Sequence, residues 1–433
     1  MLAANTRRLD SAEEPTPPLD RQSQAVPTLR PMETNELPDH LARPHIRRFI
    51  PIGIKPKDAE RPVVLLQDPL RLSDRTINIS PEALALLQRF QGEKTLEEIA
   101  ESVGAKSDQL IPLVKALDEI GLLWGPTSSA MEQDLCARID GEGRLPKGAA
   151  FSLGTDAAEC RKQLAGWLEE TEDPEVGDGV VGIVAPHLDY GRGWPVYAAA
   201  YRAAAALPRP DRIVVLGTNH FGIGDGVVMT RWGFESPLGA VEPDREIQAK
   251  LAEALGERAL ADQLDHVGEH SIQLHLPWIQ HLFPEVPVVA ALVPDPLTGL
   301  IEDDGKRVGT EEFLAALGSA LEEAGGRTFF IASSDLSHAG PQFGEPRAVD
   351  EERRGQVEKH DREMLRRFID ATPSEFLETV EWNRNPTRWC SVGNMAATKR
   401  LANPGSVELL DYRQAVDEQG VALVSCAALA LLK

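Results

Sequence analysis

The chain has little of what disulfide-rich, nucleic-acid-binding or membrane-spanning proteins depend on. Four cysteines among 433 residues are too few for a disulfide scaffold. Lysine and arginine number 45 against 68 acidic residues, and the formal net charge of −23 disfavours binding to phosphate backbones or anionic membranes. The longest apolar run, residues 421–432, is shorter than the roughly 18–20 residues that cross a bilayer. We therefore expect neither a nucleic-acid nor a membrane partner.

The remaining composition is that of a globular protein with several parts. No apolar stretch typical of a signal peptide follows the first residues, so we expect a soluble, cytoplasmic protein. Residues 1–42 are rich in proline, glutamate, arginine and threonine without an apolar period, which predicts a disordered leader. Residues 43–125 and 147–433 have the patterns of two folded domains. Residues 126–146 between them are expected to be a linker.

The segment 43–125 is predicted to be a small α+β domain of the winged-helix type. A strand-like run is followed by three short helices, and Ser80 and Thr95 are the expected N-caps of the first two. Residues 81–125 carry four basic and eight acidic side chains, which favours docking of a protein or peptide over DNA binding. The segment resembles the small peptide-binding domains of the PqqD type that accompany radical-SAM enzymes.

The segment 147–433 alternates apolar runs with alanine-rich helical stretches. Continuous apolar strands alternating with helices are typical of a mostly parallel sheet that is covered on both faces. We therefore predict an α/β fold with helices on both sides of the sheet. The runs expected to be its strands are 180–185, 212–217, 286–293 and 328–333.

Histidine follows three of these runs closely. His187, His220 and His338 each come just after a run, and Asp335 precedes the last of them. Ligands of open α/β sheets bind at the carboxyl ends of the strands, so one shared site is favoured over three separate structural histidines. Cys390 precedes a helix-like segment, where a thiolate is favoured and can bind metal. Its alternative role is that of a buried small residue.

Glu269 and His270 only superficially resemble the zinc-protease motif. That motif has the order H-E-x-x-H, whereas here glutamate comes first and the next histidine, His275, is five residues on and off the shared helical face. We reject a zinc protease on this ground. Glu269 and His270 remain open either as an acid/base pair of the site or as an ordinary helix start.

Residues from about 147 to 433 resemble the Memo family, the protein B component of the AmmeMemoRadiSam system. The Memo fold is similar to that of the class III extradiol dioxygenases, which hold non-haem iron. The motifs that carry the resemblance are Ala185-Pro186-His187, Gly217-Thr218-Asn219-His220, Glu269-His270-Ser271, Leu276-Pro277-Trp278, Ser333-Ser334-Asp335-Leu336-Ser337-His338 and Cys390.

This resemblance implies a mononuclear metal site made by His187, His220 and Cys390. Two imidazoles and a thiolate suit iron(II) or copper, with zinc also compatible, and three protein ligands leave a position open for chemistry. A closed structural zinc site, with Asp335 or His338 as fourth ligand, is the alternative.

The resemblance also implies catalytic roles. His338 matches an acid/base histidine of the dioxygenases and Asp335 matches a site carboxylate, and we expect Glu269 and His270 to assist proton transfer. At two places the sequence differs from the family pattern, which limits how far these roles apply to this chain. The family's entry motif is reduced to Gly148-Ala149-Ala150-Phe151, and the dioxygenases have a carboxylate where this chain has a thiol, so extradiol cleavage is not expected.

The expected function is that of a metal-dependent redox enzyme acting with a radical-SAM enzyme and AMMECR1-type partner proteins on a small molecule or a peptide. The alternative is a non-catalytic protein that binds a peptide or partner in the same cleft.

Overall fold

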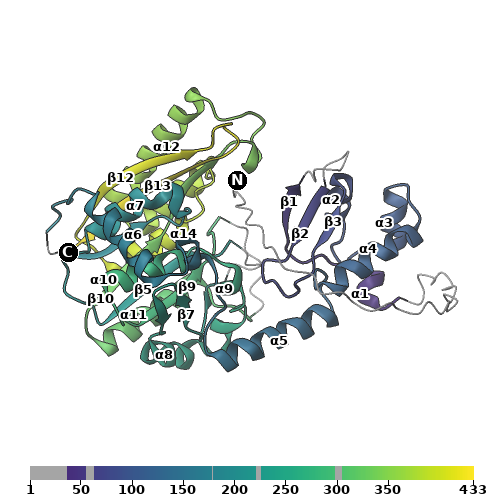
Figure 1. Cartoon of the computed structure of the whole chain (residues 1–433), viewed down its shortest axis with the longest axis horizontal. Coiled ribbons are helices and arrows are strands. Elements are labelled where there is room, and N and C mark those ends of the chain that lie inside the picture. Colours follow the sequence, from purple (N-terminus) through teal and green to yellow (C-terminus); the bar gives the residue numbers. More distant parts are fainter. Residues whose placement is uncertain (1–36, 55–62, 178, 221–225, 298–304) are drawn as a thin grey trace, which may run out of the picture.

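A small N-terminal domain and a larger C-terminal domain make up the chain (Figure 1). The computed structural model describes residues 37–54, 63–177, 179–220, 226–297 and 305–433. The predicted leader therefore lies mostly outside the described residues. Its last part contains the short helix α1 (Asp39–Ala42), and Leu41 of that helix is buried in the core of the small domain.

The small domain packs helices against a three-stranded antiparallel sheet of order β1-β2-β3. The Ser80 hydroxyl accepts a hydrogen bond from the backbone of Ala83, and Thr95 and Glu98 form a reciprocal capping box, as expected for helix starts. Its role as a winged-helix docking domain stays a prediction. Besides α1, its elements are β1 (Ile50–Ile54), β2 (Val63–Gln67), β3 (Ile77–Ile79), α2 (Pro81–Leu87), α3 (Leu96–Ser102) and α4 (Ser107–Glu119).

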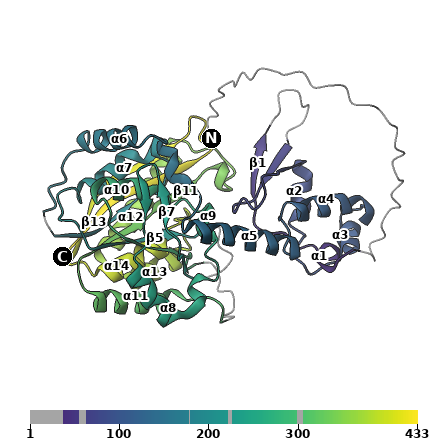
Figure 2. The same cartoon turned by 60° about the horizontal axis from the view of Figure 1, so that its bottom comes forward.

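The segment expected to be a linker is mostly helix. Helix α5 (Pro126–Glu142) runs from the small domain to the large one in both ribbon views (Figures 1 and 2). Proline is favoured at a first helical position, and Gly143 ends the helix in the left-handed conformation. Leu135 and Ile139, four residues apart and so on one face, are buried in the core of the large domain. That core therefore begins before residue 147.

The large domain is built on an eight-stranded sheet in which β4, β10, β5 and β9 run parallel, with antiparallel strands at the margins. The mostly parallel α/β fold predicted from the sequence is confirmed. Along the path the strand order is β11-β13-β4-β10-β5-β9-β6, and β12 pairs with β13. The strands are β4 (Val180–Ala185), β5 (Arg212–Thr218), β6 (Val228–Met229), β9 (Val288–Val293), β10 (Thr328–Ser333), β11 (Asp335–Ala339), β12 (Ser406–Val416) and β13 (Leu423–Leu432), with a separate hairpin of β7 (Phe234–Ser236) and β8 (Gly239–Val241).

Helices cover both faces of this sheet. In β5 the neighbours Val214 and Val215 belong to different apolar clusters, which is why the strands have continuous apolar runs. One face packs α6, α7 and α10, and the other packs α8, α11, α12, α13 and α14. The helices are α6 (Ala157–Glu169), α7 (Tyr190–Arg202), α8 (Arg245–Leu255), α9 (Asp265–Gly268), α10 (Leu276–Leu282), α11 (Thr310–Ala324), α12 (Glu351–Asp370), α13 (Pro373–Asn383) and α14 (Val392–Ala402), with 3₁₀ turns η2 (Ala149–Leu153), η3 (Gly256–Leu260), η4 (Gln273–His275) and η5 (Pro341–Phe343).

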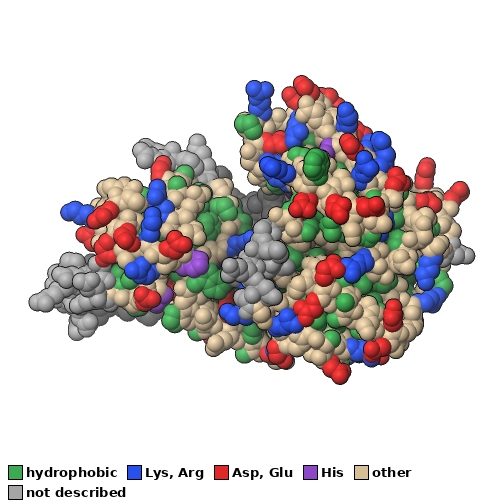
Figure 3. All heavy atoms as spheres, turned by 180° about the vertical axis from the view of Figure 1, so that it is seen from behind, with side chains coloured by type: hydrophobic (Ala, Val, Ile, Leu, Met, Phe, Trp, Pro, Cys, Tyr) green, Lys and Arg blue, Asp and Glu red, His purple; other side chains and the backbone are tan. Residues whose placement is uncertain are grey.

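The surface carries both signs of charge. Acidic and basic side chains are interspersed over the face shown in Figure 3, and no basic patch forms there. Within the described ranges, no helix has the length and apolar character that crossing a bilayer requires.

Candidate metal centre

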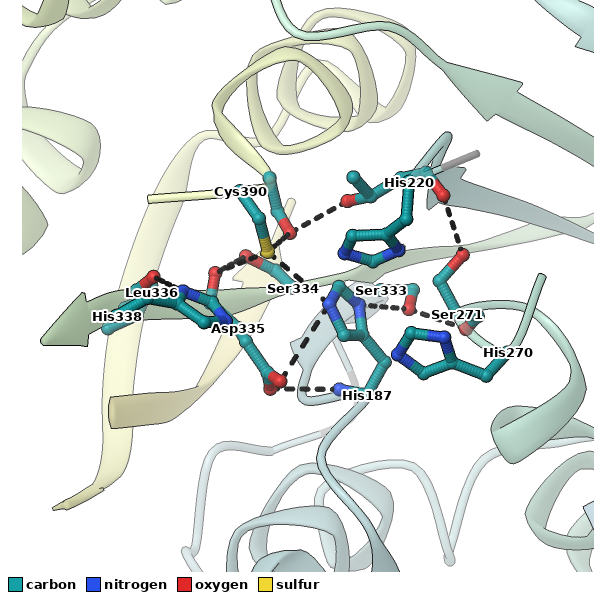
Figure 4. Close-up of polar contacts among 12 residues, drawn as sticks. His187, His220, His270, Ser271, Ser333, Ser334, Asp335, Leu336, His338 and Cys390 are labelled. Carbon is teal, nitrogen blue, oxygen red and sulfur yellow. Dashed lines mark hydrogen bonds and ion pairs between the residues drawn. The ribbon is translucent and has the colours of Figure 1, made fainter. Parts of the chain in front are cut away.

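Three candidate ligands meet at the carboxyl edge of the sheet. His187 follows β4, His220 follows β5, and Cys390 comes just before α14. One ligand atom from each lies within 4.8 Å of the others, and Cys390 Sγ is 3.3 Å from His187 Nε2. Figure 4 shows the thiol and the two imidazoles turned toward one another. The convergence follows from topology, because β4 and β5 are parallel and both pair with β10.

His187 contacts Cys390 through Nε2, the ring nitrogen that would bind a metal. His187 Nδ1 is 3.0 Å from the Ser333 hydroxyl, which itself donates to the carbonyl of Ser271. Since that hydroxyl proton is already used, Nδ1 must be the donor and Nε2 carries a lone pair. Burial, followed by the neighbouring His220 and His270, holds the pKa of His187 well below its usual value. A neutral imidazole is the form that binds metal.

His220 is oriented by a buried carboxylate. Its Nδ1 lies 3.0 Å from Glu269 Oε1, and its backbone N–H donates to Glu269 Oε2 at 2.8 Å. Burial lowers the pKa of His220, but the attraction of Glu269 and then of Cys390 outweighs it, so the pKa is raised. Burial raises the pKa of Glu269, but His220 outweighs it and the net shift is downward. Glu269 and Cys390 thus both bind the His220 ring, and a carboxylate beside a ligand histidine is common around metal centres.

His270 lies against this pair. Its ring stacks on His220 with centroids 4.8 Å apart and meets the ring of His187 edge-on at 5.3 Å. Its Nδ1 is 3.2 Å from Glu269 Oε1, so His220, Glu269 and His270 form a second group of atoms that could hold a metal ion. Burial lowers the pKa of His270 to about 4. Glu269 directly follows α9 in an extended conformation and does not lie in the first turn of a helix, so the helix start considered from the sequence is not present.

Asp335 is the buried carboxylate of the site. Its Oδ1 accepts the backbone N–H of His187 at 3.0 Å, and its Oδ2 is 3.7 Å from His187 Nε2. Burial raises the pKa of Asp335 to about 7, against the hydrogen bond from His187. The carboxylate therefore fixes the position of the segment that carries the first histidine.

His338 lies to the side of the three clustered imidazoles, beyond Asp335 in Figure 4. Its Nδ1 lies 3.0 Å from the carbonyl of Leu336 and 3.1 Å from that of Arg388, and its ring meets Phe343 edge-on. Burial lowers the pKa of His338 to about 4. Among the described residues it belongs to neither group of converging ligand atoms.

Several polar residues that position the ligands could not be found from the sequence. Asn394 on α14 donates to the Ser333 carbonyl at 2.6 Å and to the Thr218 hydroxyl at 3.1 Å. The Ser391 hydroxyl contacts both Thr218 and Cys390. Small hydroxyl and amide residues have no distinctive spacing, and only their place beside strand ends could have drawn attention to them.

The small domain touches this centre. Arg48 Nη1 donates to the backbone carbonyl of His220 at 2.6 Å. A Cβ on Gly268, which precedes Glu269, would lie 2.5 Å from the Pro69 carbonyl oxygen, so the two domains meet closely there. The sequence contained no sign of this contact.

The donor set fits a transition metal. Ligand atoms bound at about 2.0–2.3 Å in tetrahedral geometry lie roughly 3.5 Å apart. The distance between Cys390 Sγ and His187 Nε2 is 3.3 Å, and all three ligand atoms lie within 4.8 Å of one another. The α/β sheet with imidazole and thiol groups at its carboxyl edge thus defines a candidate metal-binding protein.

Comparison with known proteins identifies its family. Residues 144–431 match the Memo-like protein family, and the chain belongs to this family. It is 32% identical over 294 residues to a MEMO1 family protein of Methanopyrus kandleri, an alignment covering 64% of this chain and 94% of that protein. A MEMO1 family protein of Methanococcoides burtonii is 28% identical, covering 66% of this chain and 97% of the relative.

The alignment with a third relative covers more of the chain. The MEMO1 family protein of Aquifex aeolicus is 26% identical over 359 residues, covering 80% of this chain and 90% of its own length. The large domain alone cannot supply that coverage, so the likeness includes part of the region before it.

Proposed function

We propose that this protein holds one iron(II) or copper ion through His187, His220 and Cys390 and acts as a metal-dependent redox enzyme. The observation that supports it is the convergence of three ligand atoms within 4.8 Å while Nδ1 of each imidazole is occupied elsewhere. The thiolate and two imidazoles also accept zinc, so metal identity is part of the test.

When bound, the ion would supply a Lewis-acidic, redox-capable centre with a coordination position open to a small molecule. The protein's own groups hold the ligands in place: Glu269 accepts the backbone N–H groups of His220, His270 and Ser271, and Asp335 accepts that of His187. We assign proton transfer to His270, which faces both ligand imidazoles, and to His338 at the side of the site.

We further propose, from the family resemblance, that the protein acts with a radical-SAM enzyme and an AMMECR1-type protein on a small-molecule or peptide substrate. Size-exclusion chromatography of purified mixtures would test the partnership, since a stable complex elutes earlier than either protein.

Elemental analysis of protein purified without oxygen tests the metal proposal. We expect about one iron or copper per chain, and His187→Ala and His220→Ala should each lower this value to background. His360→Ala, which alters a histidine on α12 away from the centre, is the matched control and should retain the metal. Wild-type protein without metal, or full retention by His187→Ala, would refute the site.

A dioxygen-consumption assay with an added reductant then separates enzyme from binding protein. Consumption that depends on both histidines supports redox catalysis. A fully metallated protein that consumes no dioxygen would favour the non-catalytic alternative, a protein that binds a peptide or partner in the same cleft.

A further inference from the structure

A second pocket lies between the two domains, apart from the metal centre. Its volume is about 600 Å³, within the range of small-molecule sites. The small domain contributes Arg47, Arg48 and Asp68, helix α5 contributes Glu132, and the segment leading into α9 contributes Gln263. Figures 1 and 2 show α5 passing between the small domain and α9.

The charged groups of the pocket are mostly acidic. Two arginines line it: Arg47 binds Glu132 and the Gly121 carbonyl, while its Nε has no partner among the described residues, and Arg48 donates to the His220 carbonyl. The five carboxylates are Asp68, Glu132, Asp140, Asp262 and Asp265.

Some of these carboxylates have strong partners and some do not. Asp140 pairs with Arg231, and Asp262 pairs with Arg307. Asp68 accepts the backbone N–H groups of Leu70 and Leu72, and Glu132 pairs with Arg47, yet burial outweighs these interactions and the pKa of each carboxyl group is raised. Burial makes the negative charge of both groups unfavourable, and a cation in the pocket would stabilise it.

Gln263 is an independent sign of a ligand. Its side chain lines the pocket with 9% of its surface exposed, and its Oε1 has no hydrogen-bond partner among the described residues. Buried amide oxygens are rarely left without a donor, because desolvation without a hydrogen bond is unfavourable. A donor brought by a ligand would satisfy this acceptor.

We propose that this pocket binds an organic cation, a primary ammonium or guanidinium group on a short carbon chain. Gln263 Oε1 and the neighbouring carboxylates accept its N–H groups. Leu70, Leu260 and Leu264 contribute apolar wall for the carbon chain, and Trp124 offers an aromatic face. The volume exceeds what a bare inorganic cation would fill.

Calorimetric titration of the full chain with agmatine and with n-butylammonium tests the proposal, with 1-butanol as the neutral comparison. Both cations should bind, more weakly at higher salt, and the alcohol should not. Gln263→Met keeps the length of the side chain but removes the acceptor, and it should weaken binding by about fivefold or more. Gln356→Met, on the exposed face of α12, is the matched control and should bind as the wild type does.

Two results would overturn the proposal: no binding of either cation up to about 10 mM, or equal affinity in wild type and Gln263→Met. If Gln263→Met does not fold, Asp262→Asn is the second variant, and its affinity should fall as well. The site does not depend on the metal proposal, so metal content measured on the same samples keeps the two outcomes apart.

Discussion

Two buried polar clusters lie within the same fold, and they differ in how their hydrogen-bonding atoms are arranged. Asp361 on α12 is fully buried, and each of its two carboxylate oxygens accepts two side-chain hydrogen bonds. The donors are Ser337, Trp389, Tyr412 and Ser425. At the metal centre, by contrast, Nδ1 of each ligand histidine is bound while the remaining ligand atoms face one another.

The difference separates a structural cluster from a binding site. The Asp361 cluster ties α12, β11, β12, β13 and the segment before Cys390 together, and it has no lone pair left to offer. The metal centre leaves lone pairs converging on one point, an arrangement that is stabilised by a cation. Burial and polarity are therefore insufficient to mark a functional site, and the metal centre is distinguished by ligand atoms that converge on one another.

The largest expected effect is on the thiolate. Cys390→Ser replaces an anionic ligand by a neutral hydroxyl, so metal affinity should fall by about 10³-fold or more while folding is retained. Cys160→Ser changes a buried cysteine on α6 outside the centre and should keep full affinity. Competition with a metal chelator measures both. Unchanged affinity in Cys390→Ser would remove the thiol from the site and favour Asp335 as third ligand.

Asp361→Ala should lower the stability of the protein and leave its metal affinity unchanged, the opposite of what is expected for Cys390→Ser. It removes an acceptor shared by four side-chain donors, three of them buried, so the free energy of unfolding should fall by about 3 kcal/mol, measured by urea denaturation. The folded fraction should still bind metal at saturation. Loss of metal with unchanged stability would contradict the division between the two clusters.

Glu269→Gln weakens the support of one ligand without removing it. The neutral amide keeps the shape but loses the attraction for His220, and metal affinity should fall by about 10–100-fold. Chelator competition again provides the measurement, with Glu257→Gln on the nearby turn η3 as control. An affinity equal to that of wild type would show that Glu269 does not orient the ligand.

The smallest expected effect is on the pH dependence of stability, and it concerns His275, a buried histidine outside the metal centre. Burial lowers the pKa of His275 to about 3, and its Nδ1 lies 2.9 Å from the Tyr201 hydroxyl. The folded pKa is below the unfolded value of about 6.5, so below pH 6.5 the unfolded chain binds a proton that the folded protein does not. The free energy of unfolding is therefore unaffected by this group above pH 6.5 and decreases as the pH falls toward 3. The slope for this group is at most about 1.4 kcal/mol per pH unit. His275→Gln should show a shallower loss by urea denaturation between pH 6.5 and 4, and an identical slope would contradict the assignment.

Much of the large domain could be predicted from local patterns. The runs at 180–185, 212–217 and 328–333 correspond to β4, β5 and β10, and the run at 286–293 contains β9. Helix α5 was missed because only Leu135 and Ile139 mark its buried face within a polar segment. Its helical character depends on packing against the large domain more than on its own periodicity.

What the sequence determined by itself was the four central parallel strands and the placement of His187 and His220 after two of them, because apolar period and chain order are local properties. Only the tertiary structure decided which groups meet. Cys390 reaches His187 across 203 residues, Glu269 reaches His220 across 49, and Arg48 reaches the same segment from another domain. Packing of whole helices and domains determines such contacts and the direction of each lone pair. The spacing of residues along the chain does not predict that direction.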